Sequence, residues 1–201
     1  MITLLANLVI NPNEPKKYYL CYVDYLVVRI PSDMKMFRSY TIGKTLVMGH
    51  NTFNQTGPLQ GRDILVLSHK DLFSPEPGVT FIKEINWKAL QELDKEFVVC
   101  GGTSVYSEAI LYANKLRLTM TELYPIDIGT YIGDKMFPDF NNYGPWVLEL
   151  VSPSVKQAGC QTGRGHKVDN FFVVEYTKTL KWRDGWSEKD HPFIFYNSNY
   201  I

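Results

Sequence analysis

Residues 97–106 read FVVCGGTSVY, and this stretch decides the fold. Its first four residues are apolar and are typical of a buried strand. Gly101 and Gly102 then end the apolar run, and residues 104–116 show the spacing of a helix. A strand, a glycine turn and a helix N-terminus form a place for a phosphate group, because the backbone can approach the anion and N–H groups point at it. We therefore expect a cofactor here, and a plain tight turn is the alternative.

Apolar runs that predict buried strands recur on both sides of this stretch. They occupy residues 2–10, 45–49, 63–68, 79–82, 115–122, 146–151 and 170–177. Strands that alternate with helices predict a mainly parallel α/β sheet of about eight strands, with the last two runs as an antiparallel edge.

Helical patterns lie between several of these runs. A helix is predicted to start at Pro31, where Ser32 or Asp33 can cap it. Residues 50–56 favour a short helix or turn, and residues 86–93 a short amphipathic helix. Residues 16–30 fit either a strand or an ordered loop, and residues 123–144 predict mostly loop.

The composition limits the class of protein. The 201 residues suit one domain with at most an appendage, and 45% hydrophobic residues can build a sizeable core. Lys+Arg and Asp+Glu both number 21, so the net charge of +0 argues against a nucleic-acid or membrane partner. Cys21, Cys100 and Cys160 lack metal-ligand spacing and suggest a reducing, cytoplasmic location without a metal. The N-terminus is typical of a strand and not of a signal peptide.

Five sequence blocks occur in a fixed order: GKTLVMGHNTF, PLQGRDILVLS, FVVCGGTSVYSEAI, LRLTMTE and GDKMFPDF. Together they resemble dihydrofolate reductase over about residues 1–178. The resemblance implies a single, mainly parallel eight-stranded sheet with flanking helices and an antiparallel C-terminal edge. It divides the chain into a dihydrofolate reductase-like domain at 1–179 and an aromatic, polar extension at 180–201. We expect the extension to lie on the body of the protein or on a partner, such as an enzyme of thymidylate metabolism.

The resemblance makes Asp33 the carboxylate of the pterin pocket and the catalytic residue. A carboxylate can accept both donors of the pterin amidine edge in a fork. Burial against Met34 and Phe37 is expected to raise its pKa, which suits a group that assists protonation near neutral pH. The local sequence alone favours a simple helix cap at Asp33.

The other substrate contacts follow from the same resemblance. Arg62 matches the arginine that binds the glutamate-tail carboxylate of folate, and otherwise it is a surface arginine after a turn. Thr119 matches a threonine that supports the pterin carboxylate by a side-chain hydrogen bond. The remaining implied substrate-binding residues are Ala6, Met34, Phe37, Thr56, Leu59 and Cys100.

NADPH is the cofactor that the resemblance implies. Three groups of residues are expected to bind it. The first is a phosphate-binding turn whose Gly–Gly peptide is cis, made of Gly101, Gly102, Thr103, Ser104 and Val105, with Tyr106 near the nicotinamide. The second is another phosphate turn, made of Gly49, His50, Asn51 and Thr52, and the third is the adenosine end, made of Leu67, Ser68 and His69. The family often has an arginine where His50 stands, so the preference for NADPH over NADH is expected to be weaker or pH-dependent. His50 and His69 are otherwise ordinary loop histidines.

One segment departs from the family pattern. The family carries an Ile-Gly step and a Pro-Trp in the loop that closes over the nicotinamide. Residues 11–32 contain neither glycine nor tryptophan, and Val28 falls about where the tryptophan is expected. We therefore expect a site that is more open, or one that Tyr22 and Tyr25 close.

The predicted activity is NADPH-dependent reduction of 7,8-dihydrofolate to tetrahydrofolate in one-carbon metabolism by a monomer. Hydride transfer to C6 would be coupled to protonation of N5 from water, assisted by Asp33. Two alternatives stay open: a non-catalytic or weakly active pterin- or nucleotide-binding protein on the same fold, and a pyrimidine reductase of the riboflavin type. Asp33 together with Arg62 argues against the second, because the pair matches the two ends of folate.

Overall fold

The computed structural model describes residues 1–14, 16–22, 25–70, 72, 76–122, 134–152, 155–156, 161–162 and 170–179. The predicted extension at 180–201 and the side chains of Tyr22 and Tyr25 lie outside the described residues. Within the described part of the chain, none of the helices combines the length and the hydropathy that a bilayer span requires.

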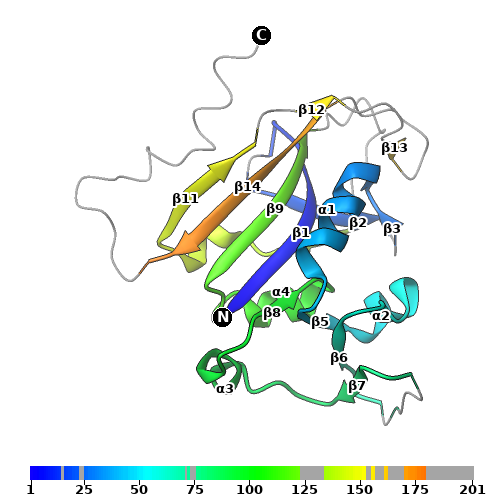
Figure 1. Ribbon diagram of the computed structural model, residues 1–201. Coiled ribbons are helices and arrows are strands. Elements are labelled where there is room, and N and C mark those ends of the chain that lie inside the picture. The colour runs from blue at the N-terminus through cyan, green and yellow to red at the C-terminus, as the bar shows by residue number, and fades with distance from the viewer. Residues whose placement is uncertain are drawn as a thin grey trace.

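A twisted sheet forms the centre of the molecule (Figure 1). Its main path in the described residues runs β11-β14-β9-β1-β8-β5-β6-β7. These strands are β1 Ile2–Ile10, β5 Thr45–Gly49, β6 Asp63–Leu67, β7 Val79–Ile82, β8 Phe97–Val99, β9 Lys115–Glu122, β11 Trp146–Val151 and β14 Asn170–Lys178. The pairings from β9 to β7 are parallel, and β14 and β11 are added antiparallel. The predicted α/β fold with an antiparallel C-terminal edge is confirmed.

In the described part of the chain, four short helices and one 3-10 turn connect the strands. They are α1 Pro31–Thr41, α2 His50–Thr56, α3 Trp87–Glu92, α4 Thr103–Ala109 and η1 Phe140–Tyr143. The prediction that Ser32 or Asp33 caps α1 is wrong, because Ile30 is the N-cap residue and no side chain caps the helix. Pro31 has no N–H to satisfy, and Asp33 lies in the first turn, where a negative charge suits the helix dipole.

Helix α4 ends earlier than the periodicity of residues 104–116 suggests. Asn114 makes two hydrogen bonds with Ile2: its backbone N–H donates to the Ile2 carbonyl, and its side-chain oxygen accepts from the Ile2 N–H, both at 2.8 Å. These bonds draw the chain into the sheet, and Lys115 begins β9. Pairing with β1 therefore overrides the helical pattern of the sequence beyond the end of α4.

The described residues between 16 and 30 include three short strands, which are β2 Tyr18–Tyr22, β3 Tyr25–Leu26 and β4 Val28–Arg29. β2 pairs antiparallel with β1 and with β10 Lys135–Phe137, a strand in a region predicted to be mostly loop. Two more short strands, β12 Val155–Lys156 and β13 Gln161–Thr162, pair with β14 and β4.

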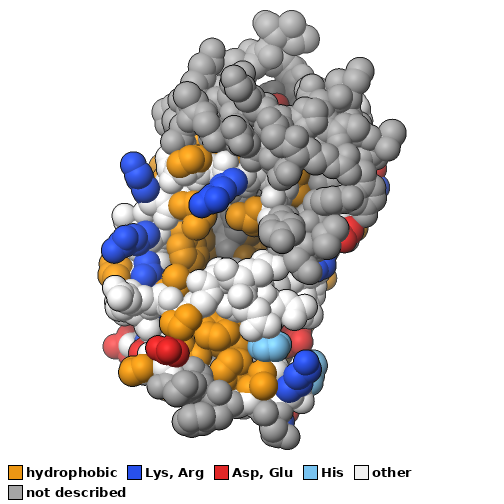
Figure 2. Space-filling view, turned by 90° about the vertical axis from the view of Figure 1, so that its right-hand side faces the viewer, with side chains coloured by type: hydrophobic (Ala, Val, Ile, Leu, Met, Phe, Trp, Pro, Cys, Tyr) orange, Lys and Arg blue, Asp and Glu red, His pale blue; other side chains and the backbone are white. Residues whose placement is uncertain are grey.

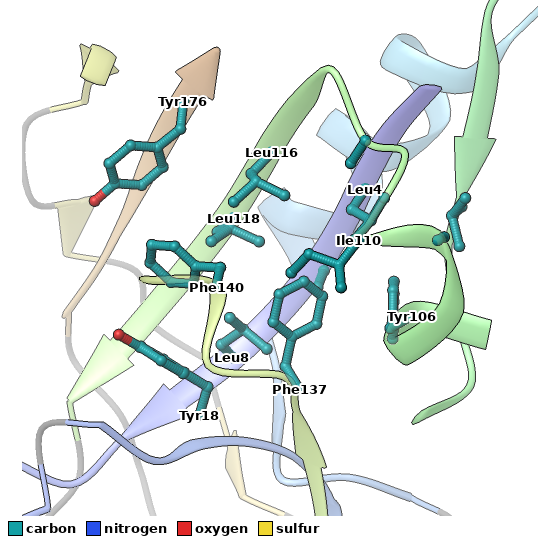
Figure 3. Packing of buried hydrophobic residues seen from close by; sticks show 14 of the residues in the cluster. Leu4, Leu8, Tyr18, Tyr106, Ile110, Leu116, Leu118, Phe137, Phe140 and Tyr176 are labelled. Atoms are coloured by element: carbon teal, nitrogen blue, oxygen red, sulfur yellow. The ribbon is translucent and has the colours of Figure 1, made fainter. Parts of the chain in front are cut away.

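Side chains of β1 alternate between the two faces of the sheet. Leu4, Ala6 and Leu8 enter the larger hydrophobic cluster, together with α4 and η1. Figure 3 shows this cluster, with Phe137, Phe140 and other labelled rings closing over the strands. On the opposite face, Leu5 and Val9 belong to two smaller clusters beside α1. Asn7 lies between these two apolar residues on the same strand face.

Candidate active site

The side chains of β1, β9 and α1 meet at Asp33. Asn7 of β1 and Thr119 of β9 are direct partners in the parallel pairing, so their side chains stand next to each other on one face. Thr119 Oγ1 donates to Asp33 Oδ1 at 2.5 Å, and Asn7 Nδ2 donates to Asp33 Oδ2 at 3.2 Å. Two neighbouring strands thus hold both oxygens of one carboxylate.

The pKa of Asp33 lies above its ordinary value. Burial against the sheet is the largest cause and favours the neutral carboxyl. The hydrogen bonds from Thr119 and Asn7 and the positive charge of Arg117 act in the opposite direction, but they do not offset burial. Asp33 can therefore hold a proton at a higher pH than an exposed aspartate.

Sequence reasoning missed Asn7. No sequence block includes it, and a single polar residue in a β-strand is common. The feature that could have pointed to it is its position inside ITLLANLVI, a run in which Thr3 and Asn7 are the polar residues and all the rest are apolar. An amide in such a run needs a polar partner, because burying it without one is costly.

Arg62 lies after the turn that precedes β6, beside the last turn of α1. Its Nη2 donates to the Arg38 carbonyl at 2.9 Å, its Nε to Thr41 Oγ1 at 2.8 Å and its Nη1 to the Gln60 carbonyl at 2.7 Å. A guanidinium has five N–H donors, and within the described residues these three contacts leave one on each Nη. Two parallel donors match a carboxylate.

The turn between β8 and α4 brings the backbone close to α2. The Gly101–Gly102 peptide is cis, as the resemblance implies, and Gly101 has φ +136. A Cβ on Gly101 would lie 2.8 Å from the Thr52 side chain. Gly102 is the N-cap residue of α4 and no side chain caps this helix, so its first N–H groups lack acceptors in the helix.

The second predicted phosphate turn lies beside the first. Gly49 is the N-cap residue of α2, and its N–H donates to the Gly101 carbonyl at 2.9 Å. His50 begins α2, and its ring lies edge-on to Phe81 with the centroids 6.1 Å apart. Both turns therefore belong to one hydrogen-bonded unit at the carboxyl ends of parallel strands, where ligands of α/β sheets bind.

The remaining residues predicted to bind the cofactor differ in exposure. Thr103 is half-buried, Ser104 and Asn51 are exposed, and Val105 is buried. Tyr106 is buried, and its hydroxyl donates to the Leu5 carbonyl at 2.7 Å, which places the ring beside β1. At the adenosine end, Leu67 is half-buried, Ser68 is buried and His69 is exposed.

Most of the other predicted substrate-binding residues lie in or near α1 and α2. Phe37, Leu59 and Cys100 pack on the cluster of β5 and β6, whereas Met34 is 45% exposed. Ala6 faces the larger cluster across the sheet. Thr56 donates to the Thr52 carbonyl within α2 at 3.0 Å. Figure 2 shows apolar side chains gathered on this side of the molecule in two groups, with polar side chains and backbone between them.

The segment that differs from the family pattern contacts the site through Val28. This side chain is buried in the cluster around Val9, and its carbonyl lies 3.5 Å from Asn7 Nδ2. A valine cannot donate a side-chain hydrogen bond, so only the backbone of residue 28 reaches the polar group of the site.

Comparison with known proteins is consistent with this geometry. The family model for dihydrofolate reductase matches residues 14–157. The chain is 32% identical over 155 residues to the dihydrofolate reductase of Buchnera aphidicola subsp. Baizongia pistaciae, covering 76% of this chain and 84% of that protein. It is 32% identical over 143 residues to that of Buchnera aphidicola subsp. Schizaphis graminum, covering 70% and 78%.

A solved structure shows the same fold. The chain resembles the dihydrofolate reductase from Enterococcus faecalis complexed with NADP(H) and RAB-propyl, with a TM-score of 0.66 and 23% identity over 88% of this chain and 96% of that one. The sequence blocks, the sheet order and the family match agree, and the chain belongs to the dihydrofolate reductase family of oxidoreductases.

Proposed function

We propose that this protein catalyses the NADPH-dependent reduction of 7,8-dihydrofolate to tetrahydrofolate. The observation that carries the proposal is the placement of two charged groups at the two ends of α1. Asp33 lies in its first turn, and Arg62 is bonded to the Arg38 carbonyl in its last turn. Dihydrofolate carries donors at its pterin end and a carboxylate at its tail, which is the complementary arrangement.

Asp33 binds the pterin end. An ionised carboxylate has about four lone-pair sites, and Thr119 and Asn7 occupy one on each oxygen. The remaining sites can accept the ring N–H and the exocyclic amine of a pterin in a fork. Because the two strands hold the carboxylate, little orientational freedom is lost when the substrate binds.

Asp33 also assists protonation of N5. Its raised pKa keeps a larger protonated fraction near neutral pH than an exposed aspartate would have. The proton reaches N5 through water, since Asp33 is committed to the other edge of the ring. Turnover should therefore fall as the pH rises through the pKa of Asp33.

Arg62 binds the tail carboxylate. Its three contacts with Arg38, Thr41 and Gln60 fix the plane of the guanidinium before a ligand arrives. The two remaining N–H groups can then form a bidentate pair without ordering a mobile side chain. Arg38 adds a second positive charge nearby, which, after burial, contributes to a lowered pKa of Arg62.

The glycine turn fits the phosphates of NADPH. The backbone at Gly101 is so close to Thr52 that a side chain is excluded, and free N–H groups begin α4 and α2. When bound, NADPH supplies the hydride for C6 of the pterin. Residue 50 is a histidine where the family often has the arginine that pairs with the 2′-phosphate. A histidine pairs well with that group only when it is protonated.

The test is a direct assay. Purified protein is mixed with NADPH and dihydrofolate, and the loss of the nicotinamide absorbance is followed for the wild type and for Asp33→Asn. We expect turnover in the wild type and a fall of at least about a hundredfold in kcat/KM for the variant, because an amide cannot carry the proton and has one acceptor oxygen where the fork needs two.

Other outcomes discriminate between the alternatives. Turnover that Asp33→Asn leaves unchanged would keep the enzyme and reject the role of Asp33. Binding of both ligands without turnover would point to a binding protein on this fold. If neither ligand binds, the proposed activity is wrong, and only the family relationship stands.

A further inference from the structure

The side chain of Asn7 is unusual for its place in the sheet. On its face of β1 the neighbours are Leu5 and Val9, which pack into two separate apolar clusters. A polar amide here interrupts a face that is otherwise suited to one continuous core. Asn7 is half-buried, and an amide withdrawn from water without a partner is costly, so its position calls for a polar contact.

That contact is the Asp33 carboxylate. Asn7 Nδ2 lies 3.2 Å from Asp33 Oδ2 and 3.5 Å from the Val28 carbonyl, so one NH2 group connects α1 to β4. Thr119, the direct neighbour of Asn7 across the strand pairing, holds the other carboxylate oxygen. Within the described residues, the Asn7 amide oxygen accepts no hydrogen bond.

We propose that Asn7 is a positioning residue that fixes the Asp33 carboxylate for the exocyclic amine and ring N–H of a 2-amino-4-oxopterin, an inference that rests on the proposed function. Asn7 and Thr119 together prevent rotation of the carboxylate about its Cβ–Cγ bond, since each holds a different oxygen. The Asn7 amide oxygen also provides an additional acceptor beside the carboxylate, which favours ligands with an exocyclic amine.

An amide suits this position better than a fixed donor. When Asp33 is ionised, the Asn7 NH2 group donates to it. When Asp33 carries a proton, rotation of the amide presents its oxygen as an acceptor instead. Asn7 therefore satisfies Asp33 in both protonation states that the reaction requires.

The experiment compares Asn7→Ala and Asn7→Asp with Thr3→Val as the matched control. Thr3 lies on the same strand and the same face as Asn7, and its hydroxyl lies 3.3 Å from Glu96 Oε1, away from Asp33. Steady-state kinetics are measured across pH for each protein. Thermal unfolding and binding of NADPH are measured in parallel to show that each variant is folded.

We expect Asn7→Ala to lower kcat/KM for dihydrofolate about tenfold on the acidic plateau, since the carboxyl group loses one of the two contacts that fix its orientation. The descending limb of its pH profile should move to higher pH, because the ionised Asp33 carboxylate loses a hydrogen-bond donor and the pKa of Asp33 rises. Asn7→Asp should move the limb further, because two adjacent carboxylates share one proton. Thr3→Val should keep the wild-type profile.

A measurement on the free enzyme separates this inference from the proposed activity. NMR of aspartate-labelled protein, assigned with Asp33→Asn, gives the titration of Asp33 without substrate. An upward shift in Asn7→Ala supports the contact even if the wild type has no turnover. A titration and a pH profile identical to the wild type, or an equal loss of activity in Asn7→Ala and Thr3→Val at every pH, would overturn the proposal.

Discussion

Asp33 combines its proposed role with a cost to stability. Burial raises its pKa in the folded protein, so ionisation is less favourable there than in the unfolded chain. A carboxyl group with a raised pKa contributes its full stability below its ordinary pKa, and that contribution is lost as the pH rises through the folded value. Ionisation of Asp33 as the pH rises therefore makes folding less favourable.

This cost predicts that Asp33→Asn is more stable than the wild type near neutral pH. The amide is neutral and keeps an acceptor for Thr119, while Asn7 can rotate to present its oxygen. We expect a rise of a few degrees in melting temperature at pH ~7.5 that shrinks as the pH falls toward the ordinary aspartate value of 3.8. Calorimetry across this range is the measurement, and a constant difference at every pH would contradict the assignment.

Arg62 gives a second prediction at this scale. Arg62→Lys replaces a planar fork by a point charge that cannot hold Arg38, Thr41 and Gln60 and a ligand together. We expect KM for dihydrofolate to rise about tenfold or more, with little change in kcat. A dihydropterin without the benzoyl-glutamate tail is the control, because its kinetics should be the same in both proteins. A loss of equal size with this short substrate would show that Arg62 acts on the fold instead.

Among the elements, the turn from β8 into α4 is strongly constrained by its sequence. Gly101 has φ +136, a conformation that side chains rarely adopt, and Thr52 fills the space where a Cβ would stand. Thr52 itself is in α2, so this contact sets the distance between the first turn of α2 and the β8–α4 turn. The Gly49 N–H bonded to the Gly101 carbonyl adds a second link between the two turns.

Gly101→Ala should therefore disrupt the turn and reduce NADPH affinity. We expect a loss of about 2–3 kcal/mol in the free energy of unfolding, since backbone strain and a clash with Thr52 act together. Gly43→Ala is the control, because Gly43 has φ +73 but no atom within 4 Å of the added Cβ. That variant should lose only about 1 kcal/mol and bind NADPH normally. Urea unfolding and a fluorescence titration with NADPH measure both effects.

The elements also show what could be predicted from the sequence. Strands such as β1 and β5 are buried on both faces, so they are continuous apolar runs that periodicity detects. β10 has only three residues and exists because it pairs with β2, which lies far away in the sequence. The end of α4 likewise depends on the bonds between Asn114 and Ile2. Such tertiary pairings leave no local pattern.

The candidate site also combines residues that the sequence pattern predicts with one that only tertiary structure reveals. Arg62 and Thr119 lie within sequence blocks whose order is specific, and Asp33 lies in the helix that precedes the first block, so their proposed roles come from the resemblance. Asn7 lies in no such block, and its partner is 26 residues away in the sequence. Only the register of β1 against β9 and the position of α1 bring the amide to the carboxylate.

At the scale of the whole molecule, a charged network joins the antiparallel edge of the sheet to α1. Glu175 of β14 is directly opposite Arg117 of β9 and forms ion pairs with Arg117 and with Lys115, the latter at 2.6 Å. The Arg117 guanidinium lies 4.9 Å from the centre of the Tyr40 ring in α1. The network thus connects the strand edge with the helix that carries Asp33.

Glu175→Gln should destabilise the whole protein. Glu175 is only 8% exposed, and its removal leaves two cations without their shared partner. We expect a loss on the order of 2 kcal/mol in the free energy of unfolding, measured with urea. Asp63→Asn is the matched control, because the Asp63–Lys95 pair is largely exposed and contributes less than about 0.5 kcal/mol. Equal losses in both variants would show that the Glu175 network adds no stability.

Helix α1 has a consequence for the length of molecule that the protein can accept. Its first turn carries Asp33, and its last turn is tied to Arg62 through the Arg38 carbonyl. A helix rises about 1.5 Å per residue and turns about 100° with each one, so the number of residues in α1 fixes both the separation and the relative direction of the two charged groups. The length of α1 therefore sets the length of ligand that both groups can bind at once. Inserting or deleting one residue in α1 would misalign Asp33 and Arg62 for dihydrofolate, while each group could still bind a fragment of it alone.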